Sequence, residues 1–169
     1  MYVIEENAMR FTMKQKMLCL GDDYIVKDQK GDEAYYVDGK VFAIRDTFNV
    51  NDMKGNRLAR IQKKVLSIGS TYIVDIGGKS TIVHKNLLTF FRCSYSVDVP
   101  GPDDIKAQGN FFDFEYEFID DGGTRVAEVS KRWLTLRDTY SIDILDDVDP
   151  VMIISAAVVI DQCCHEEKE

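Results

Sequence analysis

The stretch that decides the fold is Asp149-Pro150-Val151-Met152-Ile153-Ile154-Ser155-Ala156-Ala157-Val158-Val159-Ile160-Asp161. It is the only long apolar run in the sequence, and as a helix it would be apolar on every face. Such a helix either spans a membrane or is enclosed by protein. A bilayer span needs about 20 apolar residues, and a run of about 10–14 is typical of a buried core helix. With Asp149 as a cap and Pro150 in the first turn, we predict a helix enclosed by the rest of the chain.

Most of the preceding chain predicts short β-strands separated by turns. Apolar and polar residues alternate over residues 11–18, 24–28, 34–37, 41–44, 47–50, 71–76, 80–85, 90–97 and 111–119. Asp38-Gly39 is typical of a tight hairpin turn. Many closely spaced strands of this kind favour an antiparallel sandwich or barrel.

The sequence also repeats itself, because residues 52–76 align with residues 120–144 without gaps. The coinciding pairs include Asp52 with Asp120, Gly55 with Gly123, Ala59 with Ala127, Lys63 with Lys131, Tyr72 with Tyr140 and Asp75 with Asp143. A weaker copy of the opening turn occupies residues 28–31. The repeated unit is a hairpin and the strand that follows it, which is shorter than ordinary solenoid units.

Closure of the sheet connects the strands with the apolar helix. An open antiparallel sheet has exposed edges, and closure into a barrel removes them. A barrel of about eight strands is filled by its own side chains, whereas a larger one has room inside. We therefore predict a mostly β single domain over residues 1–169, a closed antiparallel barrel of roughly a dozen strands around the C-terminal helix.

Composition excludes some classes of function. The formal net charge of −8 argues against sequence-independent binding of nucleic acid, which needs a basic surface. The N-terminus lacks the features of a signal peptide, so we expect a cytoplasmic protein without a transmembrane segment. The four cysteines show no zinc-binding spacing, and we expect free thiols.

Several motifs resemble the LURP-one-related (YxjI-like) family. They are residues 28–31, 50–55 and 61–64, Lys131-Arg132-Trp133, Arg137-Asp138-Thr139-Tyr140 and the closing residues 149–161. That family is similar to the C-terminal domain of Tubby proteins and to phospholipid scramblases. The resemblance implies a twelve-stranded barrel around a hydrophobic central helix, and it implies little about chemistry.

Basic pairs at equivalent positions of the repeat are the first candidate site. They are Lys63-Lys64 and Lys131-Arg132. Together with Lys14, Lys16 and Arg137 they could bind phosphate, as Tubby domains bind phosphoinositide head groups. The alternative is that they are solvated strand ends that keep sheet edges soluble.

A second candidate is an acidic segment before the helix, where scramblases carry a calcium-linked segment. Its carboxylates are Asp138, Asp143, Asp146, Asp147 and Asp149. Calcium requires six to eight oxygen ligands. The alternative is a solvated loop with Asp149 as the helix cap. Cys163 and Cys164, beside the helix, could be palmitoylated or could be buried thiols.

Catalysis has weak support in the sequence. His84 with Cys93 or Ser80 is the available nucleophile pattern, and no familiar catalytic motif occurs. We expect a non-catalytic, monomeric binding module without cofactor or metal, for phosphorylated lipid head groups of anionic phospholipids or for a protein partner, cytoplasmic and able to lie peripherally at a membrane. The alternatives are a small-molecule-binding protein or weak enzyme with a groove on the barrel, and a scramblase-like membrane-associated protein.

Overall fold

The computed structural model describes residues 8–16, 23–40, 47–67, 69–86, 94–99, 104–131, 139–145 and 147–166. These residues form twelve β-strands and one helix. The strands are β1 (Ala8–Lys16), β2 (Asp23–Lys27), β3 (Glu33–Lys40), β4 (Thr47–Asp52), β5 (Arg57–Lys63), β6 (Thr71–Ile76), β7 (Lys79–Lys85), β8 (Ser94–Asp98), β9 (Ile105–Asn110), β10 (Glu115–Asp120), β11 (Arg125–Ser130) and β12 (Thr139–Leu145). The helix is α1 (Pro150–Glu166).

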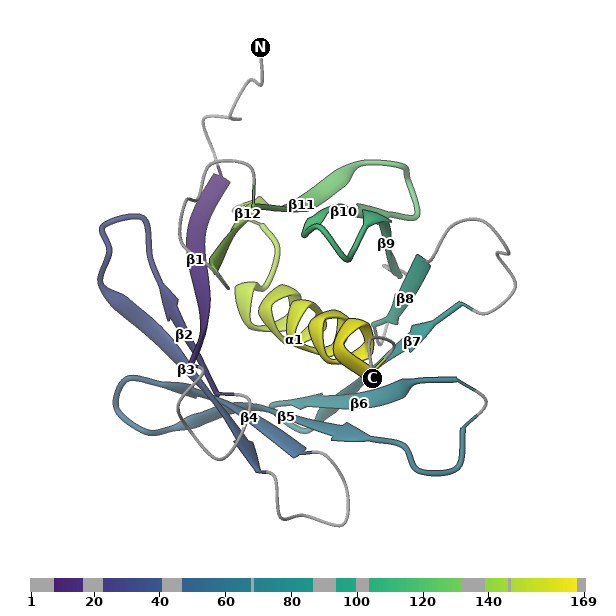
Figure 1. Ribbon diagram of the computed structural model, residues 1–169, viewed down its shortest axis with the longest axis horizontal. Coiled ribbons are helices and arrows are strands. Elements are labelled where there is room, and N and C mark those ends of the chain that lie inside the picture. The colour runs from purple at the N-terminus through teal and green to yellow at the C-terminus, as the bar shows by residue number, and fades with distance from the viewer. Residues whose placement is uncertain are drawn as a thin grey trace.

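The strands form a closed antiparallel barrel in which each strand pairs with its neighbours in sequence. Closure is made by β1 and β12, with Phe11 opposite Ile142. Figure 1 shows the barrel surrounding α1. The predicted fold class, a closed barrel of about twelve strands enclosing a C-terminal helix, is confirmed.

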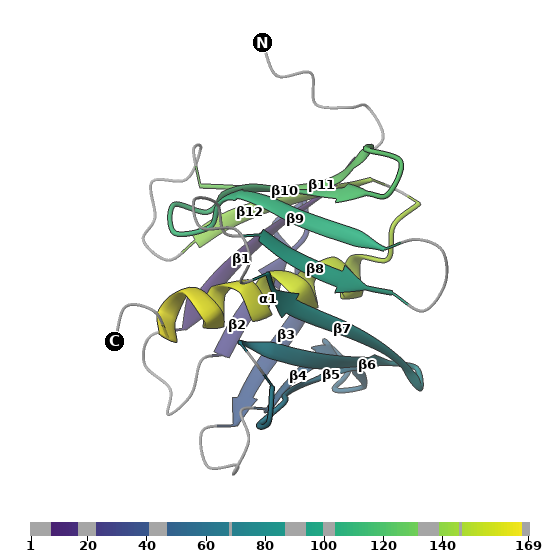
Figure 2. The same ribbon diagram turned by 90° about the vertical axis from the view of Figure 1, so that its right-hand side faces the viewer.

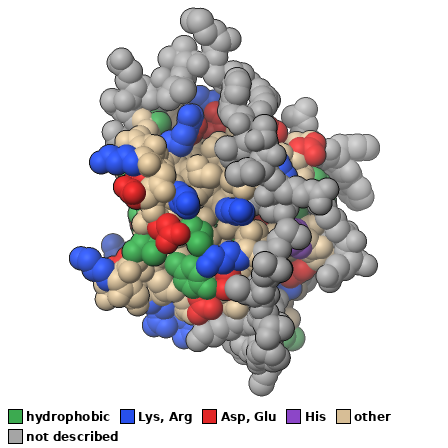
Figure 3. Space-filling model, turned by 60° about the vertical axis from the view of Figure 1, so that its left-hand side comes forward, with side chains coloured by type: hydrophobic (Ala, Val, Ile, Leu, Met, Phe, Trp, Pro, Cys, Tyr) green, Lys and Arg blue, Asp and Glu red, His purple; other side chains and the backbone are tan. Residues whose placement is uncertain are grey.

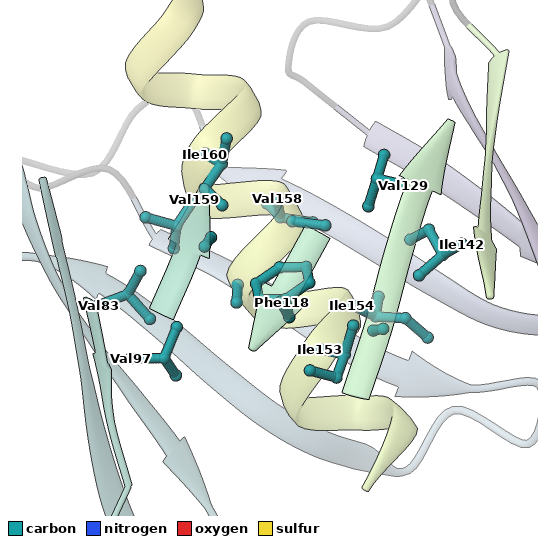
Figure 4. Packing of buried hydrophobic residues seen from close by; sticks show 14 of the residues in the cluster. Val83, Val97, Phe118, Val129, Ile142, Ile153, Ile154, Val158, Val159 and Ile160 are labelled. Carbon is teal, nitrogen blue, oxygen red and sulfur yellow. The ribbon is translucent and has the colours of Figure 1, made fainter. Parts of the chain in front are cut away.

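The helix fills the barrel. Every residue of α1 from Ile153 to Cys164 is buried. In Figure 4, Val83 and Val97 lie on one side of α1 and Val129 and Ile142 on the other. A helix apolar on all faces is stable here because inward-facing strand residues surround it. Asp149 caps the helix, since its Oδ1 accepts a hydrogen bond of 2.9 Å from the Val151 N–H.

The repeated turns have the same geometry wherever the motif occurs. In β2–β3, β4–β5 and β10–β11, an aspartate carbonyl accepts a bond from the N–H of a glycine with positive φ. The aspartate carboxylates of Asp28, Asp52 and Asp120 also accept backbone N–H bonds within their turns. Each hairpin has a register shift just before its turn. The repeat predicted from sequence is therefore a repeat of this bulged hairpin.

The barrel has two different ends. We call the end where α1 begins the helix-start end; the connections that follow even-numbered strands lie there. The helix-exit end is where α1 ends, and the connections that follow odd-numbered strands lie there. Figure 2 shows α1 running along the barrel interior between these ends.

One turn prediction and one strand boundary are wrong. Asp38-Gly39 is not a hairpin turn, because both residues lie inside β3 opposite Asn49 and Phe48 of β4. There the Gly39 N–H donates to Asp23 Oδ1 at 2.9 Å, which favours the extended strand. The strand predicted over residues 111–119 begins only at Glu115, because residues 111–114 form a turn in which Phe114 has φ 55°.

The helix is also longer than predicted. The sequence places its end at Asp161, but α1 continues to Glu166. The first polar residues after the apolar run, Asp161 and Gln162, are buried and hydrogen-bonded to Tyr24, so the helix continues past them instead of ending there. The predicted strand over residues 41–44 lies outside the described residues.

Candidate functional site

An aromatic collar surrounds the last turns of α1 at the helix-exit end. Each even-numbered strand carries an aromatic residue at its second position, and all of these side chains are buried. They are Tyr24, Phe48, Tyr72, Tyr95, Tyr116 and Tyr140. The strands are antiparallel, so these positions all lie at the same end of the barrel. The collar gives α1 hydroxyl partners where its sequence becomes polar.

The first polar contact inside the collar joins β2 to α1. Tyr24 Oη donates to Asp161 Oδ2 at 2.7 Å, and Gln162 Nε2 donates to Tyr24 Oη at 2.8 Å. His165 Nε2 lies 3.6 Å from Asp161 Oδ1. Burial, together with the nearby Asp161 carboxylate, raises the pKa of Tyr116 and Tyr140 well above the ordinary value. These phenols therefore stay protonated and can act as hydrogen-bond donors.

The second polar contact holds the last turn of α1 against β5 and β6. Glu166 Oε1 accepts from Lys63 Nζ and, at 3.2 Å, from Tyr72 Oη. Ser70 Oγ lies 3.3 Å from Glu166 Oε2. One carboxylate thus has an ammonium and two hydroxyl donors, which is a donor set suited to an anion.

The two copies of the repeat differ at this point. Tyr72 binds Glu166, but the equivalent Tyr140 hydroxyl is buried without a hydrogen-bond partner in the part of the chain that the structure describes. The Tyr140 ring stacks on Phe114, with ring centroids 4.6 Å apart. Lys131, the equivalent of Lys63, lies with Nζ 5.3 Å from the Phe114 ring centroid. The single helix breaks the symmetry of the repeat, because it ends beside only one copy.

Charges are distributed unevenly between the ends. Among the described residues, strand ends and connections of the helix-exit end carry Lys16, Lys63, Lys64, Lys85 and Lys131. The carboxylates there are bonded within the protein: Asp23 to Tyr36, Asp113 to Asn110, Glu115 to Ser130 and Glu166 to Lys63. The described connections of the helix-start end carry six aspartates, Asp28, Asp32, Asp104, Asp121, Asp147 and Asp149, and two lysines, Lys30 and Lys54.

The structure brings the predicted basic pairs to one end but not to one patch. Lys63 ends β5 and Lys64 follows it, whereas Lys131 follows β11. In the closed order of twelve strands, β5 and β11 lie six positions apart, on opposite sides of the barrel. Lys64 is exposed, Lys63 pairs with Glu166, and Arg132 lies outside the described residues. Whether these residues bind phosphate stays a prediction.

Lys14 and Lys16 lie on the outer face of β1 near the helix-exit end. Lys14 is exposed and opposite Ile25 of β2, which in turn is opposite Tyr36 of β3. Lys16 Nζ lies 5.2 Å from the centroid of the Tyr36 ring. Figure 3, which brings the β1–β3 side forward, shows a hydrophobic patch with both basic and acidic side chains around it. Arg137 lies outside the described residues.

The described carboxylates of the acidic segment do not form one cluster. Asp143 lies on β12, where Arg10 binds both of its oxygens at 2.7 and 2.8 Å. Asp149 caps α1, and Asp138 and Asp146 lie outside the described residues. Within the described ranges no group of three His, Cys, Asp or Glu side chains could hold a metal ion.

The residues considered for catalysis or acylation are also separated. Ser80 and His84 lie four residues apart on β7, which at about 3.4 Å per residue is too far for a hydrogen bond. His84 Nδ1 instead lies 3.5 Å from Asp98 Oδ2, and Cys93 is outside the described residues. Cys163 and Cys164 are buried, and burial raises the pKa of Cys163 to about 12. Both thiols are thus inaccessible to an acyl donor in this fold.

The aromatic collar was missed in the sequence, although a signal for it exists. Each collar residue follows a polar residue at the start of a strand: Asp23, Thr47, Thr71, Ser94, Glu115 and Thr139. This polar–aromatic pair recurs at a nearly even spacing along the chain. The gap-free repeat includes only two of its members, Tyr72 and Tyr140.

The fold and the site define a class of protein: a closed antiparallel barrel that encloses a hydrophobic helix, with its polar contacts at the helix-exit end. The family model of LURP-one-related proteins matches residues 9–161. The chain belongs to this family.

One sequence relative agrees with this assignment, and one solved structure shares the fold. YxjI of Bacillus subtilis (strain 168) is 26% identical over 157 residues, which cover 93% of this chain and 94% of YxjI. An X-ray structure of an Arabidopsis thaliana protein is similar with a TM-score of 0.66 at 14% identity, over 92% of this chain and 91% of that one. At this identity the second likeness concerns the fold. In the described part of the chain, no helix is long and apolar enough to cross a membrane.

Proposed function

We propose that this protein is a non-catalytic module that binds the phosphorylated head groups of anionic phospholipids with the helix-exit end of its barrel. The observation that carries the proposal is the uneven distribution of charge among the described residues, with more lysines than carboxylates at the helix-exit end and more aspartates than lysines in the connections of the helix-start end. Lys64 and Lys131 are strand-end cations at the helix-exit end, and the described carboxylates beside them are already bonded within the protein. A net charge of −8 does not prevent such binding when the basic groups face the membrane and the acidic ones face away.

The filled interior supports an external ligand site. The residues of α1 from Ile153 to Cys164 are buried inside the barrel. A ligand therefore has to use the outer face or one end, where lysines can reach phosphate oxygens. The separation of Ser80 from His84 along β7 favours binding over catalysis.

Vesicle flotation tests this function. The protein should float with vesicles of phosphatidylcholine and phosphatidylserine, or of phosphatidylcholine and a phosphatidylinositol phosphate, and not with phosphatidylcholine alone. Each lysine near an anionic surface contributes about 1 kcal/mol. The double variant Lys64→Gln with Lys131→Gln should therefore bind roughly thirtyfold more weakly. Lys64 is a better probe than Lys63, because Lys63 also holds Glu166.

The matched control changes the same charge at the other end. Lys54→Gln with Lys79→Gln alters the β4–β5 turn and the start of β7 at the helix-start end. We expect nearly unchanged flotation of this control. Equal losses of vesicle binding in both double variants would mean that binding depends on overall charge. Failure of the unmodified protein to float with any anionic vesicle would refute the proposed function. A partner-binding function would then be the remaining hypothesis.

A further inference from the structure

The connection between β5 and β6 exposes two large apolar side chains at the helix-exit end. Leu66 is 93% exposed and Val65 is 61% exposed, and both follow directly after Lys63 and Lys64. Single exposed apolar residues are common on protein surfaces. Here two exposed apolar residues are adjacent at the tip of a turn and directly follow two lysines, which is typical of a contact surface rather than of isolated exposure.

This turn is ordered by its own hydrogen bonds. The Lys64 N–H donates to the Thr71 carbonyl at 2.8 Å and closes the turn. Ser67 Oγ lies 3.1 Å from the Lys64 carbonyl oxygen and 2.9 Å from that of Gly69. Val65 and Leu66 therefore project from a backbone that hydrogen bonds already fix, and binding would not pay the entropy cost of ordering this turn.

The base of the turn is tied to the core. Glu166 of α1 binds Lys63, Tyr72 and Ser70, which lie on both sides of the turn. A further exposed apolar side chain, the aromatic Phe112 in the connection from β9 to β10, lies at the same end of the barrel. At the helix-start end, the comparable exposed residue is Met53 in the β4–β5 turn, next to Lys54.

From this arrangement we infer that Val65 and Leu66 insert into the head-group and upper acyl region of an anionic bilayer, while Lys64 contacts the lipid phosphates. Apolar side chains gain free energy on leaving water, and flanking lysines match the negative surface charge. The inference rests on the proposed function and adds to it the orientation of the protein and the residues that enter the lipid. A protein partner with an acidic, apolar surface is an outcome that the experiment must separate.

Depth-dependent fluorescence quenching tests the insertion. Leu66→Trp is compared with Met53→Trp, its control at the opposite end, and with the unmodified protein, which reports Trp133 alone. The probes are vesicles of phosphatidylcholine and phosphatidylserine whose acyl chains are brominated. We expect quenching and a blue shift of the added emission only for Leu66→Trp. Quenching of Met53→Trp instead, or of neither variant on bound vesicles, would overturn the inference.

A second variant separates insertion from charge. Val65→Ser with Leu66→Ser should bind about tenfold more weakly and should lose any binding that persists at high salt. Unchanged binding of this variant, in a protein that floats and responds to Lys64→Gln with Lys131→Gln, would overturn insertion and leave the proposed function intact. If the unmodified protein does not float, the proposed function itself fails.

Discussion

The two ends of the barrel are held together by different kinds of contact. At the helix-start end, Asp28, Asp52 and Asp120 each close a turn with residues three or four positions away. At the helix-exit end, Tyr24 and Asp161 are 137 residues apart in sequence, and Lys63 and Glu166 are 103 residues apart. Local contacts close the turns of the first end, and long-range contacts hold the last turns of α1 at the second.

This difference means that the turns at one end depend on nearby residues, whereas the proposed binding end depends on the position of α1. The turns of the helix-start end are closed by residues that are near neighbours in sequence, and the same Asp–Gly turn recurs there. The polar contacts of the helix-exit end form only when α1 is in place, because α1 supplies the carboxylates of Asp161 and Glu166 that strand residues bind. Substitutions at the two ends should therefore have different consequences, and we order them by expected effect.

The largest effect is expected from a charge in the segment that both ends require. Ala157→Asp places a carboxylate at a fully buried position of α1, where the surroundings are apolar. The cost of burying an unpaired charge exceeds the stability of most domains, so we expect loss of the folded protein. Circular dichroism and soluble yield measure the effect, with exposed Met53→Asp as the control. A soluble Ala157→Asp protein with a cooperative transition would contradict enclosure of the helix.

The next effect concerns the long-range contacts of the helix-exit end. Tyr24→Phe removes the hydroxyl that binds Asp161 and Gln162, leaving both buried groups with one partner fewer. We expect a loss of about 1–3 kcal/mol in the free energy of unfolding. Urea denaturation at neutral pH measures this loss.

Tyr140→Phe is the matched control for Tyr24→Phe. Tyr140 lies in the same collar, but its buried hydroxyl lacks a hydrogen-bond partner among the described residues. Its removal should be neutral or slightly stabilising, because no bond is lost. Equal destabilisation by both substitutions would mean that ring packing, and not the hydroxyl contact to α1, accounts for the effect.

A smaller effect is expected in the turns of the helix-start end, which are closed by local contacts. Gly55 has φ +86°, a left-handed conformation, and an added Cβ would meet no atom within 4 Å. Gly55→Ala should therefore cost about 1–2 kcal/mol through backbone strain alone. Gly55→Asn should cost less, since asparagine tolerates this conformation. If alanine and asparagine were equally tolerated, backbone strain at this turn would be disproved.

The smallest effect at neutral pH is expected from the thiol of Cys163. Its pKa is raised to about 12 by burial, above the ordinary value of 9.0, so the folded state holds this proton more tightly than the unfolded state. The corresponding stability is fully present below pH 9 and is lost as pH rises toward about 12. Cys163→Ala should flatten the decrease in stability over this window, as measured by urea denaturation at a series of pH values. An unchanged slope would exclude this thiol as a contributor.

Much of the fold could be predicted because its decisive signals are local. The Asp149–Pro150 start of α1 and the apolar run that follows are adjacent in sequence, and alternation marked most strands. Asp38-Gly39 was misread because the bond from Gly39 to Asp23 joins β3 to the start of β2, across a hairpin. Phe112 and Phe114 were misread because their alternation continues into a turn, where Phe114 adopts a positive φ.

The candidate site was less predictable. The sequence identified Lys63-Lys64 and Lys131-Arg132 as equivalent pairs, and the repeat placed them at corresponding strand ends. It contained no signal that Glu166 would form an ion pair with Lys63, because the polar residues after Asp161 resemble a solvated tail. It also left the exposure of Val65 and Leu66 undecided, since two apolar residues after a strand can equally pack inward.

The apolar run, the alternating strands and the Asp–Gly turns specify an enclosed helix and a closed sheet, because hydrophobic burial and backbone geometry act through sequence periodicity and near neighbours. Barrel closure assigned the equivalent lysines to one end but to opposite sides. It also buried Asp161 against Tyr24 and left Leu66 exposed to solvent. These outcomes depend on where the single helix ends within the closed barrel, which no local pattern encodes.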